Sequence, residues 1–260
     1  MRYAAPLLLL ALCLLTLLFP SLALASAREA LGLFFENVLP ALFPFYVLTS
    51  MLCRTALFSD LEQRPQRAGL LCYMLGGLAG YPVGARLSAA LGRESLSAGC
   101  NQCSPMFLLG VVSLAMYRDA AMFPVLAIAH YGAAGLVLLL NSVLGAAEPS
   151  QPCIRQTRNT GGTAFFADIG DGMLAMLRIG GCVLFFYVMA RLLCRVLPVE
   201  ESPLPVALVS GVLEMTSGCA QVRALGFPPR ICAGMYAFFV SFGGLSVFAQ
   251  SVITAGLQRP

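Results

Sequence analysis

Long apolar runs separated by short polar stretches dominate the sequence. The run YAAPLLLLALCLLTLLFPSLALA, which begins at Tyr3, already exceeds the roughly 20 residues with which a helix crosses a hydrocarbon core about 30 Å thick. Further apolar runs cover residues 33–57, 100–117, 121–145, 170–197 and 230–257. The pattern predicts an all-α integral membrane protein with about six transmembrane helices.

Two shorter apolar segments, residues 69–91 and 203–222, are interrupted by Gly, Pro and small polar residues. They contain LLCYMLGGLAGYPVGARLSAAL and LPVALVSGVLEMTSGCAQV, and neither forms a continuous apolar helix. We therefore expect two re-entrant helical hairpins, which enter the membrane and turn back. Non-helical backbone at that depth must be buried in protein or face a wet cavity, because lipid offers it no hydrogen bonds.

Three pairs of motifs recur in the same order and at nearly the same offset. FPFYVLTSMLCR (43–54) matches LFFYVMARLLCR (184–195), and CNQCSPMFLLG matches SFGGLSVFAQS. Between them the two interrupted segments align, with Gly77 on Gly211 and Gly84 on Gly218. The chain therefore reads as two copies of one unit, made of a long helix, a hairpin and an interrupted helix.

The repeat divides the chain into four parts. An N-terminal transmembrane helix or signal anchor (1–27) precedes a first repeat (28–145), a polar linker (146–169) and a second repeat (170–260). If the hairpins do not cross the membrane, an odd number of crossings separates the two repeats, and the second is inverted. Inverted repeats with broken helices that meet near the bilayer centre are typical of secondary transporters.

The N-terminus allows two interpretations. Arg2, the apolar stretch and ALASA fit a signal peptide cleaved near Ala25, whereas the length of the stretch favours a retained helix. With the N-terminus in the cytoplasm, more arginines fall on the inner than on the outer side, as the positive-inside rule requires.

Composition excludes several functions. The chain is 59% hydrophobic and 11% charged, and its basic residues are scattered arginines, which argues against a nucleic-acid partner. It has no phosphate-binding loop, nucleophile elbow or metalloprotease motif, so we expect neither an ATPase nor another enzyme. No cofactor is expected, and Na⁺ or H⁺ are the candidate coupling ions. The expected partners are the bilayer and a small-molecule substrate, with a homo-oligomer left open.

Glu214 is the one carboxylate inside the apolar segment GVLEMTSGCAQ, and an ionisable residue at membrane depth is a functional candidate. It could bind Na⁺, carry a coupling proton or accept a hydrogen bond from a substrate. The alternative is an ion pair with Arg178 or Arg191 in the preceding helix. Thr216 and Ser217 supply neutral polar groups beside it.

In the first hairpin, the glycine-rich GGLAGYPVGAR predicts a tight turn with exposed backbone amides, which favours an anion. Arg86, just past the turn, could add a charge-assisted contact to a carboxylate, or could extend to the headgroups instead.

The stretch CNQCSP predicts a break in a helix, because Pro105 removes a backbone donor. Asn101 and Ser104 then offer polar groups beside the break, and the matching SFGGLSVFAQ offers Gly243, Gly244 and Ser241. Cys100 and Cys103 have the spacing of a metal clip, but no second cysteine pair exists to complete a zinc site. His130 is expected to bond a neighbouring helix rather than to relay protons.

The motifs LPALFPFYVL, GGLAGYPVGARL, CNQCSPMFLLGVV, VLEMTSG and FVSFGGLSVFAQSV, in this order, resemble the sporulation integral membrane proteins of the YlbJ (SpoVV) type. That family carries nucleoside-recognition "Gate" domains and resembles concentrative nucleoside transporters, and its members are implicated in moving dipicolinate across a forespore membrane. The resemblance covers roughly residues 33–258. It implicates as substrate-binding residues Gly80, Tyr81, Pro82, Arg86, Asn101, Ser104, Glu214, Thr216, Ser217, Ser241, Gly243 and Gly244.

Two hypotheses follow. The first is a multi-pass permease, in the cell or forespore membrane, for a small polar or anionic metabolite such as dipicolinate or a nucleoside-like heterocycle. The second is a non-transporting membrane factor that uses the same fold for binding or assembly in spore-envelope formation. Substrate flux distinguishes the two.

Overall fold

The computed structural model describes residues 3–55, 65–144, 162–197, 199 and 202–256, which form helices and short turns without a strand. Four helical stretches in these ranges are long and apolar enough to cross a membrane: Pro20–Cys53, Met122–Val143, Ala164–Val196 and Pro229–Gly256. The prediction of an all-helical membrane protein is confirmed. The count differs from the expected six because the N-terminal run is divided between two helices and the run 100–117 is not one helix.

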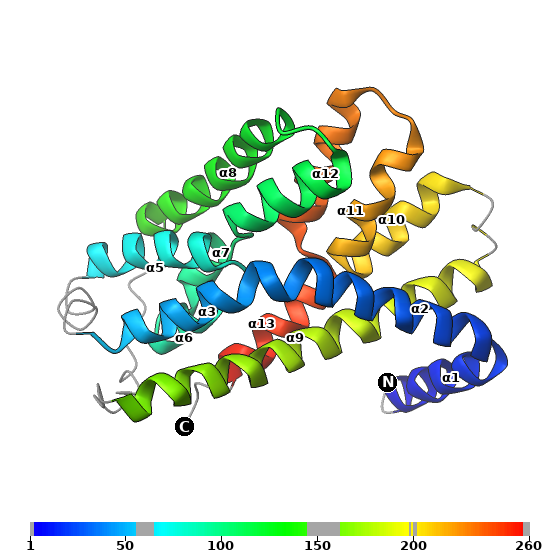
Figure 1. Ribbon diagram of the computed structural model, residues 1–260, viewed down its shortest axis with the longest axis horizontal. Coiled ribbons are helices and arrows are strands. Elements are labelled where there is room, and N and C mark those ends of the chain that lie inside the picture. Colours follow the sequence, from blue (N-terminus) through cyan, green and yellow to red (C-terminus); the bar gives the residue numbers. More distant parts are fainter. Residues whose placement is uncertain (1–2, 56–64, 145–161, 198, 200–201, 257–260) are drawn as a thin grey trace.

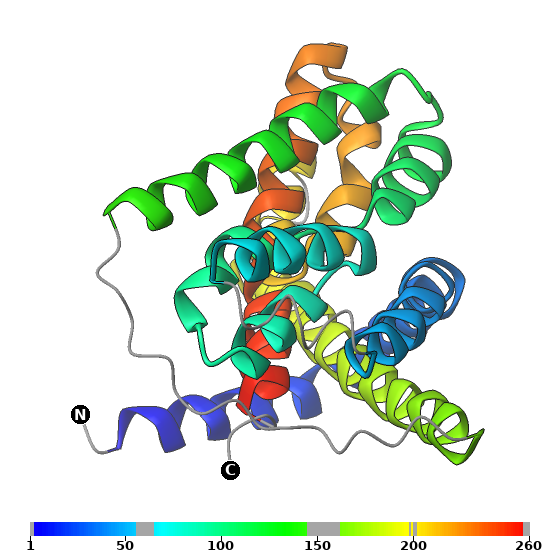
Figure 2. The ribbon, with the colours of Figure 1, turned by 90° about the vertical axis from the view of Figure 1, so that its left-hand side faces the viewer.

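The N-terminal helix α1 (Ala4–Leu18) ends at Phe19, and Pro20, which has no backbone N–H, starts α2 (Pro20–Leu33). The path then continues through the π-helical turn η1 (Phe34–Val38) into α3 (Leu39–Cys53) without leaving the helix. The expected boundary between residues 27 and 28 therefore lies inside α2. Figure 2 shows α1 projecting sideways from this path.

The longest helix, α9 (Gly162–Val196), lies beside α2 and α3 (Figure 1). Two polar contacts bind this pair. Arg54 at the end of α3 forms an ion pair with Asp168, at 2.8 Å, and Tyr187 of α9 donates a hydrogen bond to Glu29 of α2, also at 2.8 Å. Because one contact joins α9 to α3 and the other joins α9 to α2, together they hold the three helices against each other. The helices α2, η1, α3 and α9 form the scaffold of the molecule.

The helix before α9, α8 (Met122–Leu144), is largely exposed and packs against α7, η3 and α12. The polar linker expected over 146–169 falls mostly on residues 145–161, which lie outside the described residues. From Gly162 onward its sequence is already helical and belongs to α9.

Two helix pairs with tight connections occupy the interrupted segments, and Figure 1 shows them on opposite halves of the molecule. The first joins α5 (Pro65–Ala79) to α6 (Val83–Ala90), and the second joins α10 (Pro203–Leu213) to α11 (Met215–Val222). In each pair the arms touch at two glycines: a Cβ on Gly76 would come within 3.0 Å of the Gly84 Cα, and a Cβ on Gly218 within 2.2 Å of the Gly211 Cα. The structural counterpart of Gly211 is therefore Gly76, not Gly77 as the sequence alignment suggested.

Each helix pair is followed by an interrupted helix. In the first, α7 (Ser97–Cys100) ends in extended backbone before the π-helical η3 (Phe107–Tyr117). In the second, α12 (Pro229–Phe242) stops at Gly243, and α13 (Gly244–Gly256) restarts at once. The turns η2 (Glu94–Leu96) and η4 (Arg223–Leu225) connect each pair to its interrupted helix.

Candidate functional site

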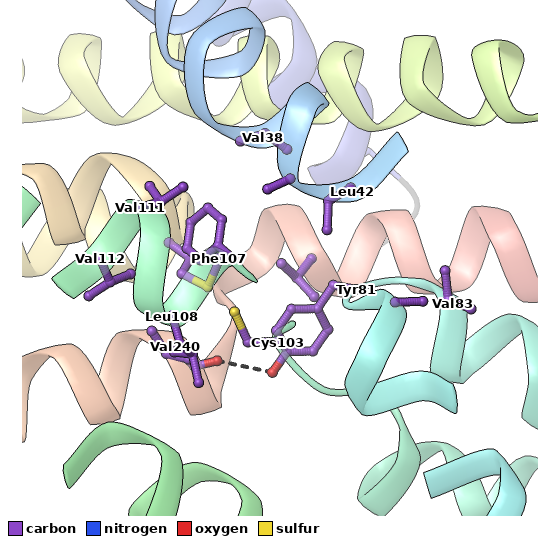
Figure 3. Close-up of a cluster of buried hydrophobic side chains, with 14 of the residues drawn as sticks. Val38, Leu42, Tyr81, Val83, Cys103, Phe107, Leu108, Val111, Val112 and Val240 are labelled. Carbon is purple, nitrogen blue, oxygen red and sulfur yellow. Dashed lines mark hydrogen bonds between the residues drawn. The ribbon is translucent and has the colours of Figure 1, made fainter. Parts of the chain in front are cut away.

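A small central cavity of about 30 Å³ lies where the two connections and the two interruptions meet. The connections of the two helix pairs supply Tyr81 and Glu214, and the start of α11 supplies Met215 and Thr216. The first interruption supplies Cys103 and Ser104, and the helices η3 and α13 supply Phe107, Val247 and Gln250. Apolar side chains of the scaffold close the cavity: Val38, Leu42, Ile179 and Val183. Figure 3 shows Tyr81, Cys103 and Phe107 beneath Val38 and Leu42. Residues from both halves of the chain thus converge on one space.

Glu214 is the charged residue of this cavity, and it is 1% exposed. It is extended between α10 and α11 and caps α11: its carboxylate accepts hydrogen bonds from the backbone N–H groups of Thr216, at 3.0 Å, and Ser217, at 2.7 Å. The positive end of the helix dipole stabilises a negative charge there. No ion pair within 4 Å joins Glu214 to Arg178 or Arg191, all three of which the structure describes.

The first connection positions Gly80, Tyr81 and Pro82. Gly80 has a φ of +83°, and a Cβ there would come within 2.8 Å of Leu42, so the turn requires glycine. The Tyr81 hydroxyl donates to the carbonyl of Val240 at 3.0 Å (Figure 3). Pro82 precedes α6 and does not line either cavity described here.

The first interruption is held by side chains. The Ser104 hydroxyl accepts a hydrogen bond from the Phe107 N–H at 3.1 Å and caps the helix that follows. Asn101 donates to the Ser251 hydroxyl at 2.8 Å and accepts from the Ala85 N–H at 3.3 Å. It thereby joins α7 to α13 and α6.

The second interruption depends on two glycines with left-handed backbone, Gly243 at φ +75° and Gly244 at φ +72°. A Cβ on Gly244 would approach the carbonyl oxygens of Gly211 and Leu213 to 3.2 Å, so the second connection packs directly on this break.

The Ser217 hydroxyl, in the first turn of α11, donates a hydrogen bond to the backbone carbonyl of Glu214 at 2.8 Å.

A larger cavity of about 450 Å³ adjoins the central one, and Tyr81 and Val247 line both. It lies between α6, α7, α12 and α13, and it includes Asn101 and Ser241. The predicted site residues are therefore divided: Ser104, Glu214 and Thr216 line the central cavity, Asn101 and Ser241 line the larger one, and Tyr81 belongs to both.

Arg86 lies away from both cavities. Its guanidinium donates to the Ser50 hydroxyl at 2.7 Å and lies over the Tyr46 ring, 4.9 Å from its centroid. Both partners belong to α3, so Arg86 joins the first helix pair to the scaffold. A cation–π contact of this kind needs a neighbour distant in sequence, which the local motif did not indicate.

His130 connects the two halves, as the interhelical interpretation expected. Its Nε2 accepts a hydrogen bond from the Cys103 N–H at 2.9 Å, and its Nδ1 lies 3.0 Å from the Ser241 hydroxyl. The cysteines of the Cys-x-x-Cys stretch are buried and unbridged, and the described residues hold no group of three metal-ligating side chains. Gln250, absent from the expected site residues, lines the central cavity and bonds Ser246.

The chain is similar to the sporulation integral membrane protein YlbJ of Bacillus subtilis (strain 168). The two are 25% identical over an alignment of 285 positions, which covers 89% of this chain and 70% of that relative. This similarity confirms the resemblance to the YlbJ type that the motifs predicted. No family model and no solved structure matches the chain.

Proposed function

Starting from this similarity to a sporulation integral membrane protein, we propose that the chain is a multi-pass permease for a small polar metabolite, such as dipicolinate or a nucleoside-like heterocycle. In this proposal it acts in the forespore or cell membrane. The pairs α5/α6 and α10/α11 are its re-entrant hairpins, and its two repeats are inverted with respect to each other.

The observation that supports transport best is the origin of the central cavity. Both connections and the first helix interruption contribute to its lining, as does α13, which starts at the second interruption, although these segments lie far apart in the sequence. The second interruption itself packs on the connection between α10 and α11. Freed backbone groups at membrane depth are tolerated where they line a cavity, and transporters place substrates at such junctions between repeats. A purely structural fold has no need of four breaks in one place.

The size of the cavity supports alternating access. About 30 Å³ holds one or two water molecules, so a ring compound enters only when the hairpin connections separate. The larger cavity on the other side of Tyr81 and Val247 has room for a small molecule in the present arrangement. Tyr81 and Val247 then form the barrier that moves during transport.

Glu214 is the proposed coupling residue. A carboxylate this deeply buried, with no cationic side chain among the described residues that line the cavity, is stable when a proton or a bound Na⁺ neutralises it. Loading and release of that cation would couple transport to an ion gradient.

Flux into proteoliposomes tests the proposal. The purified chain is reconstituted and supplied with radiolabelled dipicolinate or uridine, with and without a pH or Na⁺ gradient. We expect saturable, gradient-dependent uptake of one of them. Binding without flux would contradict transport and favour a membrane binding or assembly factor.

A further inference from the structure

The larger cavity has the chemistry of a binding site in its own right. Its volume of about 450 Å³ is that of a small-molecule site. Its lining combines three aromatic rings, Tyr81, Phe242 and Phe248, with neutral polar side chains, including Asn101, Ser241 and Ser251. Within the part of the chain that the structure describes, every residue that lines it is uncharged.

Asn101 offers one hydrogen-bond donor to this space. Its side-chain amide has two hydrogens, and one of them is used by the Ser251 hydroxyl at 2.8 Å. Its oxygen already accepts from the Ala85 N–H at 3.3 Å. The second amide hydrogen is therefore available for a ligand.

The hydroxyl of Ser241 offers a second hydrogen-bond donor to the cavity, because His130 donates to its oxygen and leaves its hydrogen unused. The Cys103 N–H can only donate, so Nε2 of His130 accepts and carries no proton. The neutral ring then has its hydrogen on Nδ1 and donates to the Ser241 oxygen at 3.0 Å. The Ser241 hydroxyl keeps its own hydrogen, which it can donate into the cavity that it lines.

Charges near the cavity disfavour an anion. Arg86, in the wall helix α6, is turned toward Ser50 and Tyr46 of α3. The C-terminal ends of α12 and α13, which carry the negative ends of their helix dipoles, border the cavity.

We propose that the larger cavity binds an uncharged, planar ring compound with hydrogen-bond acceptors, and that it rejects anions of the same shape. The aromatic side chains provide area for the ring, and Asn101 and Ser241 donate to its acceptors. The proposal deepens the proposed function and rests on it for the route by which a ligand enters. Of the two substrate classes above, it favours the neutral heterocycle.

Equilibrium binding with two probes of one shape tests this directly. Pyridine-2,6-dicarboxamide is uncharged, whereas pyridine-2,6-dicarboxylate (dipicolinate) is a dianion at pH 7.5. We expect the full chain in lipid nanodiscs to bind the diamide at least tenfold more tightly. Equal or tighter binding of the dianion, or no saturable binding of the diamide, would overturn the proposal, and this comparison requires no substituted protein.

Two variants locate the site. Ala255→Phe fills the cavity and should weaken diamide binding at least tenfold, whereas Ala133→Phe on the exposed face of α8 should leave it unchanged. Ala89→Arg adds a cation to the lining and should shift the preference toward the dianion. Unchanged binding in Ala255→Phe would contradict the location. Binding of the diamide without its flux would contradict the permease proposal and leave the proposed binding site standing. Flux of the dianion would support the permease proposal and contradict the preference of this site for an uncharged ligand.

Discussion

The hydroxyl of Tyr81 donates a hydrogen bond to the backbone carbonyl of Val240, at 3.0 Å. Figure 3 shows this bond between the first hairpin connection and the last turn of α12. The carbonyl oxygens of that turn lie just before the break at Gly243. The last carbonyls of a helix have no backbone N–H partner within the helix and need a donor from elsewhere. Since Tyr81 also lines both cavities, this bond holds the barrier between them.

Tyr81→Phe should weaken this barrier. The substitution removes the donor to a buried carbonyl, and we expect a loss of about 1 kcal/mol in the free energy of unfolding. Unfolding by SDS titration in mixed micelles measures the change. Tyr236→Phe is the matched control, because the Tyr236 hydroxyl is buried without a hydrogen-bond partner and its removal should cause no loss. Equal losses in both variants would show that the Tyr81 bond is not the cause.

Gly84→Ala should disrupt the first helix pair. The added Cβ would overlap the carbonyl oxygen of Cys100, and backbone atoms do not move aside without cost. We expect a destabilisation of about 3 kcal/mol or failure to assemble, measured by thermal unfolding in detergent. Gly181→Ala on α9, where nothing lies within 4 Å of the new Cβ, should be neutral or stabilising. A stable, unperturbed Gly84→Ala protein would contradict the close approach.

Asp168→Asn should loosen the scaffold. It removes the charge that pairs with Arg54 at 2.8 Å and leaves a partly buried guanidinium beside a neutral amide, whose oxygen can still accept a hydrogen bond. Because the Arg54 side chain is 18% exposed, we expect about 2 kcal/mol, less than for a fully buried pair. SDS titration of this variant is compared with Asp171→Asn, whose side chain is exposed and should tolerate the change. No difference between them would refute a stabilising ion pair.

His130→Ala should separate the two halves of the site. It leaves the buried Cys103 N–H without an acceptor and removes the hydrogen bond between His130 and the Ser241 hydroxyl. We expect the free energy of unfolding to fall by about 2 kcal/mol. Thermal unfolding reports the cost. His130→Gln, which can accept and donate at similar positions, should recover part of it. If the two variants are equally unstable, packing rather than hydrogen bonding explains the role of His130.

Much of the fold could be predicted because the determinants are local. Apolar runs identify spanning helices, and Gly and Pro identify breaks, as at Gly243 and in GGLAGYPVGAR. The exact partner of a glycine is not local: Gly76, not Gly77, touches Gly84, because the connection of the first pair is longer than that of the second. The same holds for Arg54 and Asp168, whose pairing depends on how α3 lies against α9.

The candidate site was predictable in part for the same reason. Glu214 stands out as a carboxylate in an apolar segment, and the structure places it in the central cavity. Arg86 has an equally suggestive position in the sequence, yet Tyr46 and Ser50, more than thirty residues away, turn it toward the scaffold. The division into two cavities depends on side-chain packing around Tyr81, for which the sequence holds no local signal.

The most direct test of the account is proteoliposome flux by Glu214→Gln, beside the unsubstituted chain and Glu36→Gln, whose side chain is exposed. All three should insert and reconstitute equally. The account predicts gradient-driven uptake by the unsubstituted chain and by Glu36→Gln, and at least a tenfold loss in Glu214→Gln, because an amide cannot take up and release the coupling cation. Full gradient-driven uptake by Glu214→Gln would contradict it.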